Sequence, residues 1–284
     1  MTAVLNVATL LAQPHSSISQ TAALHISSET PALDAELLLA QVLGIERWRL
    51  RAYPERSVSP AEAARFRALL ARRADGEPIA YLTGRREFWS LDFAVTPAVL
   101  VPRPETELLI ERALALRPEA AARIVDLGTG AGAIAIALAR ERPQWQVVAT
   151  DASLAALAVA RDNSAALGAR VEFRHGDWYG PLGGERFDLL LSNPPYVAAD
   201  DPAMQALRHE PAMALTPGAD ALSCLRTLAQ GATQHLLPGG WLILEHGSAQ
   251  GAQLRDELVL AGLRHVRSHR DLGGHERTTE GQRR

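Results

Sequence analysis

The tetrapeptide Asn193-Pro194-Pro195-Tyr196 follows directly on an apolar run, FDLLLS, at residues 187–192. Because proline has no N–H to pair across a sheet, a strand must end where the two prolines begin. Their rings also fix the backbone, which holds the carbonyl of Pro194 in a defined direction. Asn193 adds a side-chain carbonyl as a second hydrogen-bond acceptor. Two adjacent acceptors can bind both hydrogens of a planar NH₂ group, while Tyr196 covers its flat face.

Such a clamp suits the nitrogen of an amide or of an aminoaromatic ring. An amide nitrogen is a poor nucleophile because its lone pair is delocalised, and hydrogen bonds from its protons favour the pyramidal form that can attack. Transfer of a methyl group to it then depends mainly on positioning and on preorganised polar groups. We therefore predict that Asn193, Pro194 and Tyr196 are catalytic, and that they bind the substrate together with Pro195.

No catalytic histidine is needed for such a reaction, because the methylated nitrogen is cationic and sheds its proton without a strong base. We expect His209, His246 and the other histidines to have structural or surface roles. The chain has one cysteine, Cys224, so neither a disulfide nor a cysteine-based metal site can form within it. We predict no bound metal.

A glycine-rich segment, IVDLGTGAGAIAIALA at residues 124–139, joins the first predicted strand of an alternating pattern to a helix. Gly128, Gly130 and Gly132 let the backbone turn sharply and approach a ligand closely. The helix that follows presents free N–H groups to that ligand. Asp151 comes 23 residues after Gly128, at the end of the second strand, where a carboxylate can reach the ribose hydroxyls of a bound nucleoside.

These residues predict a nucleoside cofactor and leave its kind open between a dinucleotide and S-adenosylmethionine. Ala133 is acceptable at the third position of the dinucleotide fingerprint. Asp126 favours S-adenosylmethionine, because a carboxylate suits the ammonium group of a methionine moiety and would repel a pyrophosphate. After the third strand, Asp177 can accept the adenine amino group and Trp178 can pack on the ring.

Length and composition frame these motifs. A chain of 284 residues is long enough for two domains, and its net charge of −3 argues against a dedicated nucleic-acid-binding protein. The N-terminus lacks the charged start of a signal peptide. No apolar run approaches the roughly 18 residues of a membrane span. We expect a cytoplasmic protein without a membrane partner.

The first 80 residues predict a small helical domain. The segment 31–44 carries Leu33, Leu37 and Val42 on one face, with Leu38 and Leu39 beside them, and a second helix begins after residue 59 with the pattern of a capping box. Residues 81–102 predict a linker with a β-hairpin that turns near Thr96-Pro97.

Residues 103–284 predict an α/β domain with a Rossmann-like fold. A helix begins near Pro104, and short apolar strands then alternate with amphipathic helices, which indicates a mainly parallel seven-stranded sheet covered on both faces. The last segment, 275–284, predicts an antiparallel edge strand.

Six blocks of the sequence resemble the PrmC/HemK family of protein-(glutamine-N5) methyltransferases and stand in the family's order. They are EPIAYLTGRREFWSLDF, VLVPRPETELLI, DLGTGAGAIAIALA, SNPPY, HEPAMAL and RDLGGHERTT. The resemblance covers nearly the whole chain. It implies a class I methyltransferase that uses S-adenosylmethionine, releases S-adenosylhomocysteine and modifies the glutamine of the Gly-Gly-Gln motif in class I peptide chain release factors.

Site residues carry over from the family by motif. Those implied to bind the cofactor are Gly128, Thr129, Gly130, Ala131 and Gly132, with Asp151 on the ribose and Trp178 near the adenine. The resemblance implies that Asn193 contacts both cofactor and substrate and that residues 194–196 complete the clamp. Position 131 is often serine or threonine in the family, and a backbone contact tolerates Ala131. The resemblance also implies that the helical domain helps to recognise the release factor; we expect a monomer that does not bind nucleic acid directly.

Three alternatives stay open. A sister family methylates a glutamine of ribosomal protein L3, but it departs from the RPETE pattern and from the tryptophan at position 178 that this chain keeps. A nucleic-acid adenine N6-methyltransferase shares the NPPY tetrapeptide, but it should carry a basic target-recognition region. A non-catalytic binding module could keep the fold, although the intact clamp and glycine loop argue against it.

Overall fold

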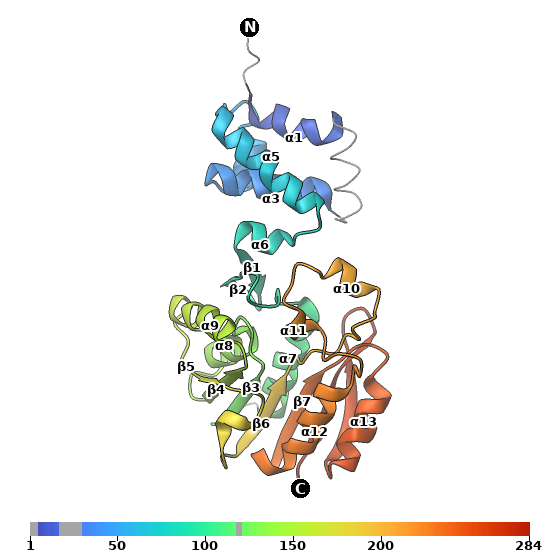
Figure 1. The fold of residues 1–284 in the computed structure, drawn as a ribbon. Helices are drawn as coiled ribbons and strands as arrows, with labels where there is room; N and C mark the ends of the chain where they lie inside the picture. The colour runs from blue at the N-terminus through green and yellow to red at the C-terminus, as the bar shows by residue number, and fades with distance from the viewer. Residues whose placement is uncertain (1–4, 17–29, 118–120) are drawn as a thin grey trace. The chain divides into compact units, whose positions relative to one another are not determined.

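The computed structural model describes residues 5–16, 30–117 and 121–284. The chain divides into two compact units, Met1–Gly84 and Arg85–Arg284. The first unit is helical and the second contains both sheets. Figure 1 labels most of the helices and strands.

The first unit is built from short helices around an apolar core. Its helices are α1 (Val7–Ser16), α3 (Pro31–Leu43), α4 (Trp48–Ala52), α5 (Pro60–Ala74) and α6 (Ile79–Thr83). The predicted capping box at the start of α5 is confirmed: the Ser59 hydroxyl accepts from the Glu62 N–H, and the Glu62 carboxylate accepts from the Ser59 N–H at 2.8 Å. The buried side chains Phe66 and Leu70 then pack α5 into the core.

The buried face of α3 differs from the predicted one. Leu38, Leu39 and Leu43 are buried, whereas Leu33 is 37% exposed. The helix has apolar residues around most of its circumference, so their spacing alone does not select a face. Asp34 lies on the buried side and forms an ion pair of 2.6 Å with Arg73 of α5, and this long-range contact fixes the rotation of α3.

The second unit begins with the hairpin of β1 (Arg85–Phe88) and β2 (Leu91–Ala94). The hairpin itself was predicted, but the position of its turn was wrong. A turn does form at residues 96–99, where the Val99 N–H donates to the Thr96 carbonyl at 3.1 Å, but it follows the hairpin. The hairpin turn is Trp89-Ser90, and both residues have left-handed backbone angles, with φ of 52° and 56°, as a two-residue hairpin turn requires. Neither residue is a usual choice for that conformation, so the sequence carried no signal for it.

The remaining elements form a seven-stranded sheet with helices on both faces. The strands are β3 (Arg123–Leu127), β4 (Gln146–Asp151), β5 (Val171–His175), β6 (Phe187–Ser192), β7 (Leu236–Glu245), β8 (Arg264–Arg270) and β9 (Glu276–Gln282). The helices are η1 (Pro104–Thr106), α7 (Glu107–Leu116), α8 (Ala133–Glu141), α9 (Leu154–Ala166), η2 (Gly180–Leu182), α10 (Ala203–Ala206), α11 (Ala212–Leu215), α12 (Ser223–His235) and α13 (Gly251–Leu260).

The strand order is β5-β4-β3-β6-β7-β9-β8, and β9 alone runs in the opposite direction to the other six strands. This confirms the predicted Rossmann-like fold class. The last segment forms the predicted antiparallel strand, but it lies between β7 and β8, so the outermost strand on this side of the sheet is β8 and not β9. In this position the polar side chains of β9 are buried, so they need hydrogen-bond partners within the protein.

Alternate residues of each central strand enter two separate cores. Ile124, Leu189 and Ile243 pack under α7 and α8, whereas Leu190 and Leu242 pack under α12 and α13. Figure 1 shows α8 and α9 on one side of the sheet and α12 and α13 on the other. Burial on both faces explains why these strands read as continuous apolar runs. Among the described helices, none is long and apolar enough to span a membrane.

Glu280 of β9 is fully buried and surrounded by cationic groups. Its carboxylate accepts from the Arg112 guanidinium of α7 at 3.0 and 3.2 Å and from Arg267 at 2.7 Å, and Nε2 of His269 lies 3.2 Å away. Burial alone would raise the pKa of Glu280, but hydrogen bonds from His269, Arg112 and Arg267 outweigh it and lower the pKa to about 2. This carboxylate therefore joins α7 to the antiparallel end of the sheet only while it is ionised.

We predict that Glu280→Gln lowers the free energy of unfolding at pH 7 by about 3 kcal/mol, because a neutral amide at this buried position loses the charge-assisted hydrogen bonds from the partly exposed Arg112 and Arg267. The folded pKa lies below the ordinary value of 4.5, so the ionised form stabilises the fold above pH 4.5. That contribution is lost as the pH falls from about 4.5 to about 2. Denaturant unfolding at pH 7 and pH 3 tests this. Glu111→Gln, on the exposed side of α7, is the control, and an equal effect of the two variants would contradict the prediction.

Candidate functional site

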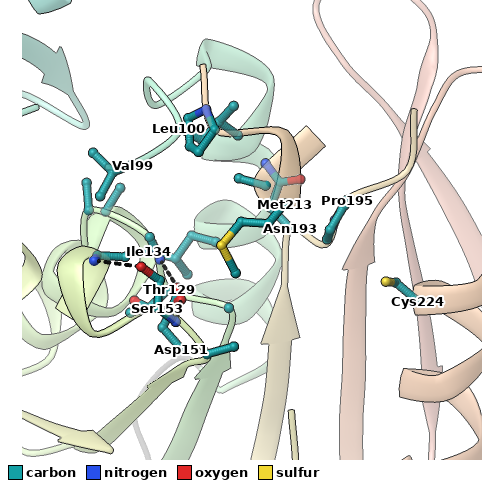
Figure 2. Close-up of a pocket in the computed structure, with 18 of the residues that line it drawn as sticks. Val99, Leu100, Thr129, Ile134, Asp151, Ser153, Asn193, Pro195, Met213 and Cys224 are labelled. Atoms are coloured by element: carbon teal, nitrogen blue, oxygen red, sulfur yellow. Dashed lines mark hydrogen bonds between the residues drawn. The ribbon is translucent and has the colours of Figure 1, made fainter. Parts of the chain in front are cut away.

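A cavity of about 400 Å³ opens at the carboxyl ends of the parallel strands, where ligands bind in open α/β sheets. One wall comes from the loops after β3, β4 and β5, and the other from the segment after β6. Figure 2 shows Thr129 and Asp151 on the first wall and Asn193, Pro195 and Met213 on the second. The cavity lies entirely within the second unit.

The glycine loop between β3 and α8 is held close against its surroundings. The N–H groups of Gly128 and Thr129 both donate to the carbonyl of Thr150 at the end of β4, at 2.9 Å. Gly128 has a φ of 76°, and a Cβ there would lie 3.3 Å from the ring of Trp178. Gly132 has a φ of 85°, and a Cβ there would lie 2.7 Å from the Ile136 side chain. Glycine is therefore required by both conformation and space.

Asp126 lies beneath this loop and does not line the cavity. It is fully buried, and its Oδ2 accepts from the Thr129 hydroxyl at 2.6 Å, whereas Oδ1 has no hydrogen-bond partner among the described residues. Burial raises the pKa of Asp126 to about 7, against the lowering effect of the Thr129 hydrogen bond. Any effect of Asp126 on a ligand in this geometry passes through Thr129, which does line the cavity.

Asp151 lies in the cavity wall and ties two loops together. Its Oδ2 accepts from the Gly130 N–H and its Oδ1 from the Ser153 N–H, both at 2.8 Å. Burial raises the pKa of Asp151, and these two hydrogen bonds oppose that effect. A carboxylate has about four lone-pair positions, so each oxygen keeps acceptor capacity for a ligand.

Asp177 and Trp178 follow β5 and both line the cavity. Trp178 has a φ of 42°, a conformation that a bulky residue adopts only when its surroundings require it. The Thr150 hydroxyl donates to its carbonyl at 3.2 Å, and its ring rests over Gly128. The predicted position of this pair beside the glycine loop is thus seen in the structure.

The tetrapeptide after β6 divides between the cavity and the protein interior. Asn193 and Pro195 line the cavity, and Pro194 and Tyr196 do not. The Asn193 amide donates through Nδ2 to the Thr106 hydroxyl at 3.0 Å, which leaves its Oδ1 available as an acceptor. The structure therefore places Asn193 in the cavity wall at the carboxyl ends of the strands, and its role there stays a prediction.

Tyr196 differs from the expectation that its ring covers a ligand in the cavity. Its hydroxyl donates to Glu245 Oε1 at 3.1 Å, and its carbonyl accepts from Gln250 Nε2 at 3.0 Å. Burial raises the pKa of Tyr196, and the neighbouring Glu245 carboxylate adds to the effect. These contacts turn the ring toward the core packed under α12 and α13, where it supports the tetrapeptide from behind.

Several lining residues were not predicted individually. They come from the segments 98–106 and 211–217, and Cys224 of α12 adds a half-buried thiol. Glu210 joins the first two segments, because it is buried, forms an ion pair with Arg103 and accepts from the Val101 N–H at 3.0 Å. Arg103 and Glu210 belong to the VLVPRPETELLI and HEPAMAL blocks, so the resemblance marked these parts of the two segments without showing that they meet.

The cavity can act on a ligand through its hydrogen-bond acceptors and through its shape. Within residues 5–16, 30–117 and 121–284, no group of three His, Cys, Asp or Glu side chains could hold a metal ion. The glycine loop, the Asp151 carboxylate and the Trp178 ring form a cradle of a size suited to a small-molecule ligand. Asn193 presents an amide oxygen across from it, so the arrangement can orient an NH₂ group toward a bound cofactor.

Comparison with known proteins relates both units to one family. The PrmC N-terminal domain matches residues 17–84, and the methyltransferase small domain matches residues 104–222. A release factor glutamine methyltransferase of Xylella fastidiosa is 51% identical over 254 residues, which cover 88% of this chain and 92% of the relative. Those of Pseudomonas aeruginosa and Escherichia coli are 48% and 43% identical, and each match covers 90% of this chain and 94% of the relative.

Solved structures resemble the fold at much lower identity. The catalytic domain of METTL16, solved with an RNA hairpin, is 17% identical with a TM-score of 0.55, covering 81% of this chain and 84% of that one. The 16S rRNA methyltransferase RsmC of Thermus thermophilus, solved with AdoMet and guanosine, is 19% identical with a TM-score of 0.52, covering 70% of this chain and 50% of that one. Both share the class I methyltransferase fold.

The contact between the glycine loop and Trp178 yields a testable prediction. Gly128→Ala and Gly130→Ala both place a side chain at a residue with positive φ. This conformation costs each variant about 1–2 kcal/mol of folding free energy. A Cβ on Gly128 also meets the Trp178 ring, whereas one on Gly130 meets no atom within 4 Å. Gly128→Ala should therefore lower the free energy of unfolding more than Gly130→Ala, and Trp178→Leu should remove the excess. Denaturant unfolding of the single and double variants measures both effects, and equal losses would contradict the contact.

Proposed function

Because the chain belongs to the release factor glutamine methyltransferase family, we propose that it transfers a methyl group from S-adenosylmethionine to the side-chain amide nitrogen, N5, of a glutamine. The acceptor is the glutamine in the Gly-Gly-Gln motif of class I peptide chain release factors, and the modification modulates translation termination. The observation that carries this proposal is the Asn193 amide, which lies in the cavity wall opposite the glycine loop.

The first wall of the cavity would hold the cofactor. S-adenosylmethionine supplies a methyl group on a positively charged sulfur and leaves as S-adenosylhomocysteine. The backbone from Gly128 to Gly132 would follow its methionine part, supported from below by Asp126 through Thr129. Asp151 would accept the ribose hydroxyls with its remaining lone pairs.

Asp177 and Trp178 would bind the adenine. Asp177 would accept the amino group of the base, and the Trp178 ring would pack on its face. The room that Gly128 leaves beside Trp178 supports this placement, because a side chain there would displace the ring.

The second wall would hold the acceptor amide. Asn193 Oδ1 would accept one N–H group of the glutamine, and Pro195 would limit how the amide can move. The Pro194 carbonyl, the predicted acceptor of the second N–H group, would have to turn into the cavity, which Pro194 does not line in this structure. Those hydrogen bonds orient the nitrogen lone pair toward the methyl group, so positioning accounts for the rate. Tyr196 would act from behind the wall by holding the tetrapeptide in place. Loss of the proton from the methylated nitrogen needs no strong base.

The helical domain, residues 1–80, would contact the body of the release factor. A glutamine in a narrow cavity must be delivered by a projecting loop, and its flanking glycines let the loop approach closely. That small contact leaves the rest of the substrate to be recognised elsewhere. Trp48 and Tyr53 of the helical unit are 59% and 52% exposed, and exposed aromatic residues are common in protein interfaces. Residues 81–102 would link this domain to the methyltransferase domain, 103–284, in a monomer that acts in the cytoplasm.

Incubation of the protein with S-adenosylmethionine and a class I release factor should add a single methyl group to the Gly-Gly-Gln glutamine. Peptide mass spectrometry locates the modification, and a release factor with alanine in place of that glutamine is the control. Whole release factor should be a better substrate than a short peptide that contains the motif, because the peptide lacks the second contact. An unmodified glutamine together with labelled DNA, RNA or ribosomal protein L3 would overturn the assignment.

Asn193→Ala should reduce methyl transfer about a hundredfold or more, as expected when one preorganised polar group is removed from a reaction centre. The variant should keep its fold, because the side chain lies in a loop after β6. Steady-state transfer to release factor and a thermal unfolding curve measure the two effects. Gln205→Ala removes an exposed amide on α10 and should leave transfer unchanged. Transfer by the Asn193 variant at the parent rate would contradict the clamp.

A further inference from the structure

Asn163 of α9 is a buried amide that contacts two separate parts of the second unit. Only 2% of the residue is exposed. Its Oδ1 accepts from the Ala94 N–H at 2.8 Å, and its Nδ2 donates to the Ala94 carbonyl at 3.0 Å. The same Nδ2 donates to the carbonyl of Ala131 in the glycine loop at 2.9 Å. Ala131 lines the cavity and Asn163 does not, so the amide connects β2 of the hairpin to the first wall from outside the cavity.

The contact with Ala94 covers the open edge of the hairpin. β2 pairs with β1 in a two-stranded sheet, so its other edge presents backbone groups that need partners. Asn163 supplies one acceptor and one donor there, as a residue of a neighbouring strand would. The hairpin is also joined to α7 and α8, because the Trp89 N–H donates to Glu107 and its ring Nε1 to Glu141, both at 2.8 Å. The hairpin therefore gives Asn163 a fixed support.

The glycine loop is held from two directions. On the β4 side, the Gly130 N–H donates to Asp151 at 2.8 Å. On the α9 side, the loop comes so close that a Cβ on Gly132 would lie 3.2 Å from a side chain of that helix, and Asn163 binds the Ala131 carbonyl there. Glycine at position 132 offers little steric resistance to rotation of the peptide that precedes it. The bond from Asn163 therefore restrains the loop at the point where its own sequence restrains it least.

The three contacts require a primary amide at position 163. The NH₂ group has two hydrogens, one for each carbonyl, and Oδ1 accepts the Ala94 N–H, so each contact uses a different part of the group. A carboxylate of the same size would keep the acceptor and place its other oxygen against two carbonyl oxygens. An apolar side chain would leave three backbone groups without their partner. Hydrogen bonding can thus be separated from side-chain size by substitution.

We propose that Asn163 is a positioning residue for the cofactor, which holds the peptide between Ala131 and Gly132 in its binding conformation and makes the hairpin a support of the first wall. It acts through the loop and does not touch the ligand. The part that concerns the cofactor rests on the proposed function, whereas the restraint on the loop can be measured in the protein without any ligand.

The first experiment measures affinity in the full chain with Asn163→Leu and Asn163→Asp. The Kd for S-adenosylmethionine should rise about tenfold in both variants, as when a hydrogen bond that fixes a binding group is lost. The value of kcat at saturating cofactor should stay within about threefold, so that the effect appears in the KM for the cofactor. Isothermal calorimetry and steady-state transfer measure these quantities. A Kd within about twofold of the parent value in both variants would overturn the proposal.

Ser164→Ala is the matched control on the same helix. Its buried hydroxyl donates to the Ala169 carbonyl at 3.0 Å and contacts neither the hairpin nor the glycine loop. Thermal unfolding should show a lower midpoint for this variant and for both Asn163 variants, but its Kd should stay within about twofold of the parent value. An equal loss of affinity in the control would reduce Asn163 to a general contributor to stability and overturn its positioning role.

Ala94→Pro tests the hairpin separately. It removes the N–H that Asn163 accepts, at an exposed position, and leaves the bond to Ala131 in place. The Kd for S-adenosylmethionine should rise by about threefold, less than in Asn163→Leu, because the amide keeps its contact with the loop but loses part of its support. Parent affinity in this variant would overturn the role of the hairpin.

Hydrogen exchange of backbone amides, measured by NMR without ligand, is independent of the cofactor. The N–H groups of Gly132 and Ala94 should exchange faster in Asn163→Leu than in the unmodified protein, and at the parent rate in Ser164→Ala. Unchanged exchange of Gly132 in Asn163→Leu would overturn the restraint on the loop. Failure of the unmodified protein to bind S-adenosylmethionine would count against the proposed function instead, and the exchange rates would still decide whether Asn163 holds the loop.

Discussion

The parallel pairing of β3, β4, β6 and β7 determines where the chemical groups of the cavity meet. The glycine loop follows β3, Asp151 ends β4, Asn193 follows β6 and Glu245 ends β7. The strands run in the same direction, so all of these groups lie at one edge of the sheet. A slip of one residue in any pair would turn the side chains of that strand to the opposite face. The two apolar cores, which accept alternate residues of each strand, exclude such a slip.

Two buried carboxylates support the two walls of the cavity in a similar way. Asp126 lies under the glycine loop and binds the Thr129 hydroxyl, and Glu245 lies behind the tetrapeptide and binds the Tyr196 hydroxyl. Each has one oxygen without a partner of ordinary geometry in the described structure, and burial raises the pKa of each to about 7. Burial of such groups lowers stability. Their position under both walls fits the rule that local inconsistencies gather at functional sites.

Local patterns in the sequence predicted most of the elements and much of the cavity. The strand ends, the glycine loop, Asp151 and the capping box at Ser59 depend on residues close together in the chain, and their spacing carries the information. The buried face of α3 and the direction of the Tyr196 ring depend on Arg73 and Glu245, which lie far away in the sequence. The hairpin turn at Trp89-Ser90 is held by the core around Phe88 and Phe93. No local pattern could reveal these choices.

The ion pair between Glu210 and Arg103 limits how the cavity can be redesigned to accept a different methyl acceptor. It joins two segments of the cavity wall that are more than a hundred residues apart in the chain, and the same carboxylate binds the Val101 N–H. A library that varies residues 210–217 to admit a different side chain would therefore also disturb residues 98–106, unless Glu210 is kept. In selection experiments, the two segments should be exchanged together between homologues and not recombined separately.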